Sequence, residues 1–307
     1  WHGDINYFVC GDSGYFRRSD NGFEKKGGQC TVKGKKRAVN FFRYFFLGLG
    51  GIVILYPLSI LVITAFKTQK DYMMSAVKLP EKWMFSNLIT VLETSNIGQA
   101  FFNSLLIVTV SVVLQIFFGA LTAYALTKMN FEKSGKYTIA FLFPMIFPIQ
   151  SFVIPLYLIY SSIGLLDTKS GLILIYIATG LPLVIFMLTS FMKTVPVEIS
   201  ESARVEGANE FTIFFRLIVP LLQPVIATIT IISGLGIWND FFMPLIMISD
   251  IDKKTLPLKI YDFMGQYTSN WPLICVCILF IIIPILIVYC IMQKYIIEGV
   301  AAGAVKG

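Results

Sequence analysis

One polar segment, residues 193–220, lies between two long apolar runs and carries acidic side chains interspersed with small ones. Thr194 is placed to cap a first helix, and Gly207 lies where a left-handed residue would end that helix. Asn209 can then cap a second helix that runs into the following apolar stretch. The pattern predicts a helix–turn–helix. Such an element can insert into a groove on a soluble partner, or it can be a surface helix without one.

The chain lacks the residue patterns of catalysis. The nearest approach to a phosphate-binding G-x-x-x-x-G-K-[ST] loop, at residues 28–36, has one residue too many and ends in lysine. Glu201, Glu206 and Asp240 make no plausible acid–base pair in one site, G-x-S-x-G is absent, and the single histidine is His2. The cysteines do not have zinc spacing. We therefore expect no enzymatic activity, no metal and no cofactor in this chain.

The composition indicates a membrane protein. Hydrophobic residues make up 56% of the chain and charged residues 14%, against about 25% charged in a soluble domain. This excludes a soluble fold and also disorder. The apolar runs are continuous rather than alternating, which favours helices over a membrane β-barrel. We predict an all-α membrane protein with six transmembrane helices. They are expected at 40–66, 101–126, 137–160, 171–191, 220–248 and 271–293.

The basic residues predict the orientation of these helices. If both termini are cytoplasmic, 17 of the 25 Lys and Arg residues lie inside and 8 lie outside, as the positive-inside rule requires. The net charge of +7 then reflects topology rather than nucleic-acid binding. The expected organisation is a cytoplasmic, disordered tail (1–39), a first transmembrane helix (40–66), an external loop (67–100), a five-helix core (101–293) that contains the polar segment (193–219), and a cytoplasmic tail (294–307).

Two further features of the apolar runs bear on function. Ionisable side chains are nearly absent from them, which disfavours an ion-coupled transporter and suggests another energy source. Prolines are frequent, with Pro144, Pro148 and Pro155 in the third run. Each proline removes a backbone donor, so we expect either kinked helices that line a pathway or ordinary membrane-helix irregularity.

The polar segment resembles a known loop. The order Glu201-Ser202-Ala203, three residues, Gly207, nine residues and Leu217-Ile218-Val219-Pro220 is similar to the E-A-A, x3, G, x9, I-x-L-P loop of bacterial ABC importer permeases. Ser202, Leu217 and Val219 are mild departures, and Glu206 stands where the sugar branch usually has Asp. The likeness extends over about residues 39–307 to the shorter membrane subunit of the maltose-type carbohydrate permeases. The other matching positions are Asn103-Ser104-Leu105, Ala123-Tyr124-Ala125-Leu126, the prolines of the third run, Trp238-Asn239, Thr255-Leu256-Pro257 and Gly303–Gly307.

This resemblance implies a type I ABC importer permease fold in the bacterial cytoplasmic membrane. It implies a heterodimer with a second permease, two cytoplasmic ATPases that bind ATP and Mg, and an external solute-binding protein. The transported solute would be a sugar or oligosaccharide. The outer loop at 249–270 would face the binding protein, and the tail at 299–307 would approach the ATPases. The residues implied to couple the chain to an ATPase are Glu201, Ser202, Ala203, Glu206, Gly207 and Pro220.

The substrate pathway is less well marked. Aromatic faces and hydrogen-bonding side chains commonly hold sugars, which makes Asn103, Tyr124, Trp238 and Asn239 candidates, although packing explains the same residue types. Gln115 and Gln150 have side chains that could serve in the same way. Two other functions remain open: an ABC permease for an amino acid, anion or peptide, and an ion-coupled transporter or membrane scaffold.

Overall fold

A computed structural model describes residues 8–9, 15–19, 22–26, 29–129, 133–265 and 269–304, with side chains described for 40–129, 133–265 and 269–291. The chain divides into two compact units, residues 1–60 and 61–307. Each unit is described by itself.

The first unit contains a small antiparallel sheet and most of the first helix. Strands β1 (Phe8–Val9), β2 (Tyr15–Ser19) and β3 (Gly22–Lys26) pair in the order β1-β2-β3. Strands β2 and β3 are antiparallel, and Ser19 pairs with Gly22. Helix α1 begins at Gln29. The disordered tail expected at residues 1–39 stays a prediction, and residues 1–7, 10–14, 20–21 and 27–28 of it lie outside the described part of the chain.

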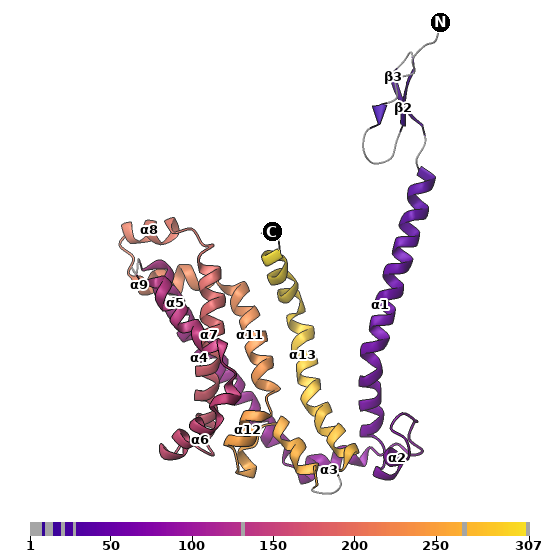
Figure 1. Ribbon diagram of the computed structural model, residues 1–307, viewed down its shortest axis with the longest axis vertical. Coiled ribbons are helices and arrows are strands. Elements are labelled where there is room, and N and C mark those ends of the chain that lie inside the picture. The colour runs from indigo at the N-terminus through magenta and orange to yellow at the C-terminus, as the bar shows by residue number, and fades with distance from the viewer. Residues whose placement is uncertain are drawn as a thin grey trace. The chain divides into compact units, whose positions relative to one another are not determined.

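The second unit is helical (Figure 1). Its elements follow the end of α1 (Gln29–Ala65) in this order: α2 (Gln69–Met74), α3 (Ser86–Thr94), α4 (Ile97–Lys128), α5 (Ser134–Leu142), η1 (Phe143–Ile146), η2 (Ile149–Phe152), α6 (Val153–Ser162), α7 (Lys169–Met192), α8 (Glu198–Val205), α9 (Glu210–Thr212), η3 (Ile213–Ile218), α10 (Val219–Leu221), α11 (Gln223–Trp238), α12 (Phe242–Met247), η4 (Ile251–Lys253), η5 (Pro257–Phe263) and α13 (Trp271–Ala304).

Within the described part of the chain, four helices are long and apolar enough to cross a membrane. These stretches are Asn40–Ala65, Ile97–Lys128, Lys169–Met192 and Trp271–Ile291. Two bent pairs of helices also qualify, so six spans result if each pair counts as one. Helix α13 continues to Ala304, well into the segment expected as a C-terminal tail.

The third predicted span is not one helix. Ser134–Ile146 and Ile149–Ser162 meet at 84°. Phe147 at the break is extended, as the residue before a proline tends to be, and Pro148 supplies no backbone donor. The span predicted over 137–160 is therefore sharply bent, in the run whose prolines gave the expectation of kinked helices.

The fifth predicted span is also interrupted. The pair Glu210–Leu221 and Gln223–Trp238 bends by 73°, with Pro224 in the first turn of α11. The helix ends at Trp238, and Asp240 Oδ1 accepts a hydrogen bond from the amide of Phe242 at 2.9 Å, which starts α12. The range 220–248 thus contains three helices rather than one.

Close packing of α4 against α7 forms the centre of the second unit. A Cβ atom at Gly119 would lie 2.5 Å from Val184 Cγ1, and one at Gly180 would lie 2.3 Å from Gln115 Nε2. These glycines let the two helices approach closely, as small residues do in membrane helix pairs. Gln115 Nε2 donates to the carbonyl of Tyr176 at 2.7 Å, so this buried amide joins α4 to α7.

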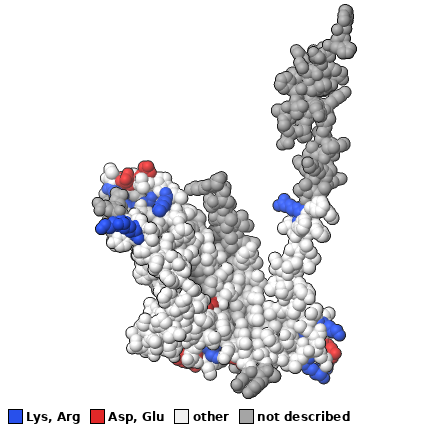
Figure 2. All heavy atoms as spheres, viewed as in Figure 1, with Lys and Arg blue, Asp and Glu red and all other residues white. Residues whose placement is uncertain are grey.

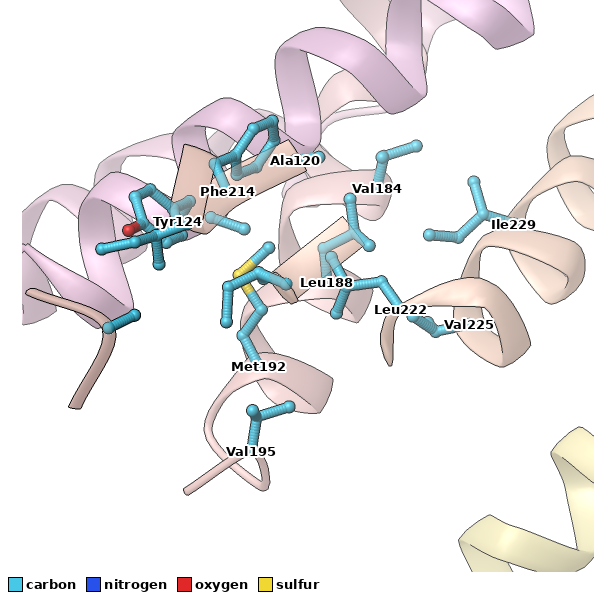
Figure 3. Packing of buried hydrophobic residues seen from close by; sticks show 14 residues of the cluster. Ala120, Tyr124, Val184, Leu188, Met192, Val195, Phe214, Leu222, Val225 and Ile229 are labelled. Atoms are coloured by element: carbon cyan, nitrogen blue, oxygen red, sulfur yellow. The ribbon is translucent and has the colours of Figure 1, made fainter. Parts of the chain in front are cut away.

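A buried apolar cluster extends this packing toward α8. Figure 3 shows Ala120 and Tyr124 of α4, Val184, Leu188 and Met192 of α7, Phe214 of η3, and Val225 and Ile229 of α11. Segments far apart in sequence therefore share one core beneath the polar segment. A second cluster, around Trp238, Leu256 and Val276, packs α13 against α4 and η5 at the opposite end. Charged side chains of this unit gather at these two ends, over α8 and around α2, and the helices between them are mostly uncharged (Figure 2).

Candidate coupling loop and substrate pathway

Helix α8 (Glu198–Val205) lies within the predicted coupling segment, with Glu198 and Glu201 in its first turn. Carboxylates there are stabilised by the positive end of the helix dipole. The residue before the helix is Val197, which makes no side-chain cap. Thr194 instead donates its hydroxyl to the carbonyl of Phe191 at 2.8 Å, at the end of α7. The predicted cap at Thr194 was therefore wrong.

The C-terminus of α8 is closed as the sequence predicts. Gly207 has a φ of +85°, the left-handed conformation that glycine adopts without strain. Its amide donates to the carbonyl of Arg204, and the amide of Ala208 donates to that of Ala203, each at 3.0 Å. These two bonds define a Schellman motif, which satisfies carbonyls that the helix end would otherwise leave unpaired.

The six predicted coupling residues are divided between two surfaces. Glu201, Ser202, Glu206 and Gly207 are exposed, whereas Ala203 is buried against the apolar core. Pro220 is exposed and lies in α10, at the far end of the segment. The structure thus places the first four on the outer face of the α8 turn, and Ala203 fixes that turn to the protein.

The second half of the segment begins as predicted. Asn209 Oδ1 accepts a hydrogen bond from the amide of Thr212 at 2.8 Å and caps α9. The helix then widens into a π-helix, η3, which buries Ile213, Phe214 and Ile218. Helices of this type commonly mark functional positions. The segment is therefore a helix–turn–helix whose second helix is irregular.

Four side chains join this segment to the end of α4, and we call them the α4 clamp: Tyr124, Lys128, Arg204 and Glu210. The Arg204 guanidinium donates to both oxygens of Glu210, at 2.7 and 3.3 Å, and to the carbonyl of Lys128 at 3.0 Å. The Tyr124 hydroxyl donates to Glu210 Oε2 at 2.5 Å, and Lys128 Nζ donates to the carbonyl of Val195 at 2.6 Å. The hydrogen bonds to Glu210 raise the pKa of Arg204, which keeps its guanidinium group charged at neutral pH.

The four predicted substrate-pathway residues do not come together. Tyr124 belongs to the α4 clamp, and the Asn103 amide donates to the carbonyls of Asp252 and Lys254 at the opposite end. Trp238 is buried, packs edge-on against Phe101 and donates to the carbonyl of Ile281 at 3.2 Å. Asn239 is exposed, and its amide donates to its own helix at Leu235.

Two cavities accompany the helix breaks. One of about 410 Å³ lies between α4, α11 and α13 and is lined almost wholly by apolar side chains, including Trp238. The other, of about 290 Å³, lies at the break of the third span against α7. Phe147, Phe152, Tyr160 and Thr179 are among its lining residues. The proline pattern of the third run was the sequence signal for this second cavity, but its aromatic and hydroxyl lining was missed.

The outer loop between α12 and α13 is fastened at several points. Asp167, at a φ of +55°, accepts hydrogen bonds from the amides of Ser249 and Asp250 at 3.0 and 2.9 Å. The Asp250 amide, the Ser249 amide and nearby Lys253 hold the pKa of Asp167 below its ordinary value of 3.8. The hydroxyl of Ser104 accepts from the amide of Leu256 at 2.7 Å. We call this set of contacts the outer strap.

Sequence reasoning missed Lys128, Arg204 and Glu210. A signal for the last two was present, because Gly207 predicts a reversal of the chain that brings residues three before and three after it together. Lys128 and Tyr124 lie on a distant helix, which the local pattern does not place. Among the described residues, no group of three His, Cys, Asp or Glu side chains could hold a metal ion.

Comparison with known proteins agrees with this geometry. The family described as "Binding-protein-dependent transport system inner membrane component" matches residues 115–301. The chain is 32% identical over 273 residues to the probable starch degradation products transport system permease protein AmyC of Thermoanaerobacterium thermosulfurigenes, covering 88% of this chain and 99% of that protein. It is 35% identical over 277 residues to the multiple sugar-binding transport system permease protein MsmG of Streptococcus mutans, covering 89% and 99%.

A solved structure shares the fold. A chain of a bacterial ABC transporter involved in the import of the acidic polysaccharide alginate matches with a TM-score of 0.73 and 23% identity. The match covers 85% of this chain and 97% of that one. The predicted helical permease fold is thereby confirmed, and the chain belongs to the inner-membrane permease components of binding-protein-dependent ABC transport systems.

Proposed function

We propose that this chain is the permease subunit of a binding-protein-dependent ABC importer that carries a sugar or oligosaccharide into the cell. The exposed α8 turn with its Schellman motif carries the proposal, because it is a hydrogen-bonded surface element at one charged end of the helices (Figure 2), where a soluble partner can reach it. The printed names of the two relatives, which concern starch degradation products and multiple sugars, favour a carbohydrate over an amino acid, anion or peptide.

The mechanism follows from how α8 is connected. Two partner ATPases bind ATP and Mg, and their closure moves α8. Helices α7 and α11 precede and follow the segment, so motion of α8 is passed to them through the chain. With a second permease, these helices rock to open the pathway toward an external solute-binding protein. The α8 end then faces the cytoplasm, and the outer strap faces outward, in the bacterial cytoplasmic membrane with both termini inside.

The solute pathway is assigned to exposed polar and aromatic groups near the helix breaks. Asn239 remains a candidate because its side chain is exposed beside the end of α11. Tyr160 and Thr179, which line the 290 Å³ cavity, join it. Asn103, Tyr124 and Trp238 are weaker candidates, since each is buried and hydrogen-bonded within the protein.

The test combines isolation with transport. The tagged chain is purified from its host in mild detergent, the associated proteins are identified, and the complex is reconstituted in liposomes with its binding protein. We expect a P-loop ATPase and a second permease in the complex, and ATP-dependent uptake of labelled maltotriose or raffinose. Uptake of labelled glutamate in place of either sugar would move the assignment to another solute class. Isolation of the chain alone, under conditions that preserve other complexes, would contradict the importer assignment.

A further inference from the structure

The α4 clamp contacts both ends of α8, the proposed coupling helix. Lys128 Nζ donates to the carbonyl of Val195, just before α8. Tyr124 and the Lys128 carbonyl bind Glu210 and Arg204, on the far side of Gly207 and at the end of α8. These contacts join residues 67 to 86 positions apart in the sequence. Helix α4 is therefore fastened to a segment to which it has no direct chain connection.

The geometry of the clamp fixes direction as well as distance. Arg204 engages Glu210 through two nitrogen atoms, a fork that matches a carboxylate and sets the relative orientation of the two groups. Its third contact is to the carbonyl of Lys128, the last residue of α4, where a cation also suits the negative end of the helix dipole. Tyr124 and Lys128 are 4% and 6% exposed, so the α4 side of the clamp is shielded from water.

Apolar packing beneath the clamp cannot supply this direction. The ring of Tyr124 packs edge-on against Phe214, with centroids 5.2 Å apart, within the cluster that Figure 3 shows. The aliphatic contacts of this cluster are non-directional and tolerate sliding of one surface over the other, and the edge-on ring pair adds only a small geometric preference. Hydrogen bonds weaken steeply when their angle is lost. The clamp is therefore the part of this interface that fixes the register between α4 and the coupling helix.

We propose that the α4 clamp makes α4 move together with α8, as α7 and α11 do through their chain connections. We call α4, in this role, the third lever of the transporter. Tyr124, Arg204 and Glu210 are then positioning residues for transport, and none of them contacts solute. This inference rests on the proposed function of the α8 turn as the ATPase contact. The sequence pattern singled out Tyr124 as a candidate for the substrate pathway. The proposal gives this residue a positioning role instead.

The test separates transport from ATP hydrolysis. Tyr124→Phe removes one hydroxyl, and Glu210→Gln removes the negative charge to which Arg204 donates its hydrogen bonds. Both variants nearly keep the side-chain volume. Each is compared in reconstituted complexes with Tyr157→Phe, which removes a hydroxyl from an exposed tyrosine of α6 at the other end of the unit. We expect retained ATP hydrolysis and about a tenfold lower sugar uptake per ATP, the size of effect expected for loss of a hydrogen bond to a charged group. The control should match the unaltered chain.

A charge exchange provides the second readout. Arg204→Glu and Glu210→Arg should each lower the sugar uptake per ATP hydrolysed. The double variant should recover part of this ratio, because an ion pair between the two positions can form again. A purely structural clamp predicts a different result: less assembled complex or a lower melting temperature, with uptake per ATP unchanged. That result would overturn the third lever and leave the proposed function intact. Absence of ATP-dependent sugar uptake in the unaltered chain would overturn both.

Discussion

At the scale of single residues, Gly207 determines whether the turn at the end of α8 forms. Its φ of +85° costs about 1–2 kcal/mol for a side chain with a Cβ, and most for a β-branched one. No atom lies within 4 Å of a Cβ placed there, so the penalty comes from the backbone rather than from a clash. Gly207→Val should therefore open the Schellman motif and abolish ATP-dependent uptake and recovery of the ATPase, whereas Gly207→Asn should retain most of both.

The matched control is Gly135→Val. Gly135 is also exposed and also has open space around it, but it lies in the first turn of α5 without a positive φ. Its variant should transport normally. Equal loss of ATPase recovery in the Gly135 and Gly207 variants would mean that bulk, and not backbone conformation, disturbs this end of the protein.

At the scale of elements, the outer strap depends on the charge of Asp167. Because the folded-state pKa of Asp167 is lowered, its contribution to stability is present above the ordinary value of 3.8 and is lost as pH falls through the lower folded value. The protection factors of the Ser249 and Asp250 amides, which compare observed exchange with that of an unfolded chain at the same pH, should therefore fall in acid in the unaltered protein. Asn tolerates the positive φ at position 167 but lacks the charge. In Asp167→Asn the amides of Ser249 and Asp250 should therefore exchange faster already at pH 7.

The control for the strap is Glu93→Gln, an exposed acid on α3 outside these contacts. It should leave protection of both amides unchanged at every pH. If Asp167→Asn protected the amides as well as aspartate does at pH 7, the carboxylate charge would have no part in holding the outer loop.

At the scale of the whole molecule, orientation in the membrane can be read from two exposed positions. Val205 is 89% exposed at the α8 turn, and Ile251 is 62% exposed in the outer loop. In a cysteine-free background, an impermeant maleimide should label Ile251→Cys in right-side-out membrane vesicles. It should label Val205→Cys only after the vesicles are opened, because the distribution of basic residues predicts that the α8 end lies inside. The reverse pattern would contradict the predicted topology.

The helical class, most of the span positions and the coupling turn were predictable, because each follows from local sequence. Apolar runs of about 20 residues predict spans, and Gly207 and Asn209 predict a left-handed end and a cap that the structure contains. The prolines gave an expectation of kinks, but not the size of the bends at the third and fifth spans. Prolines indicate where a helix can bend, but tertiary packing decides whether it bends slightly or by 84°.

The sequence by itself determined the membrane class, the coupling turn and the resemblance to sugar permeases, since these depend on composition and on spacing within short segments. Only the tertiary structure decided where the proposed pathway residues lie. Tyr124 belongs to the α4 clamp, Asn103 binds the outer loop, and Trp238 lies in the core. A residue type states which hydrogen bonds a side chain can make. Which partner it meets depends on helices that pack together from distant parts of the chain, and no local pattern encodes that pairing.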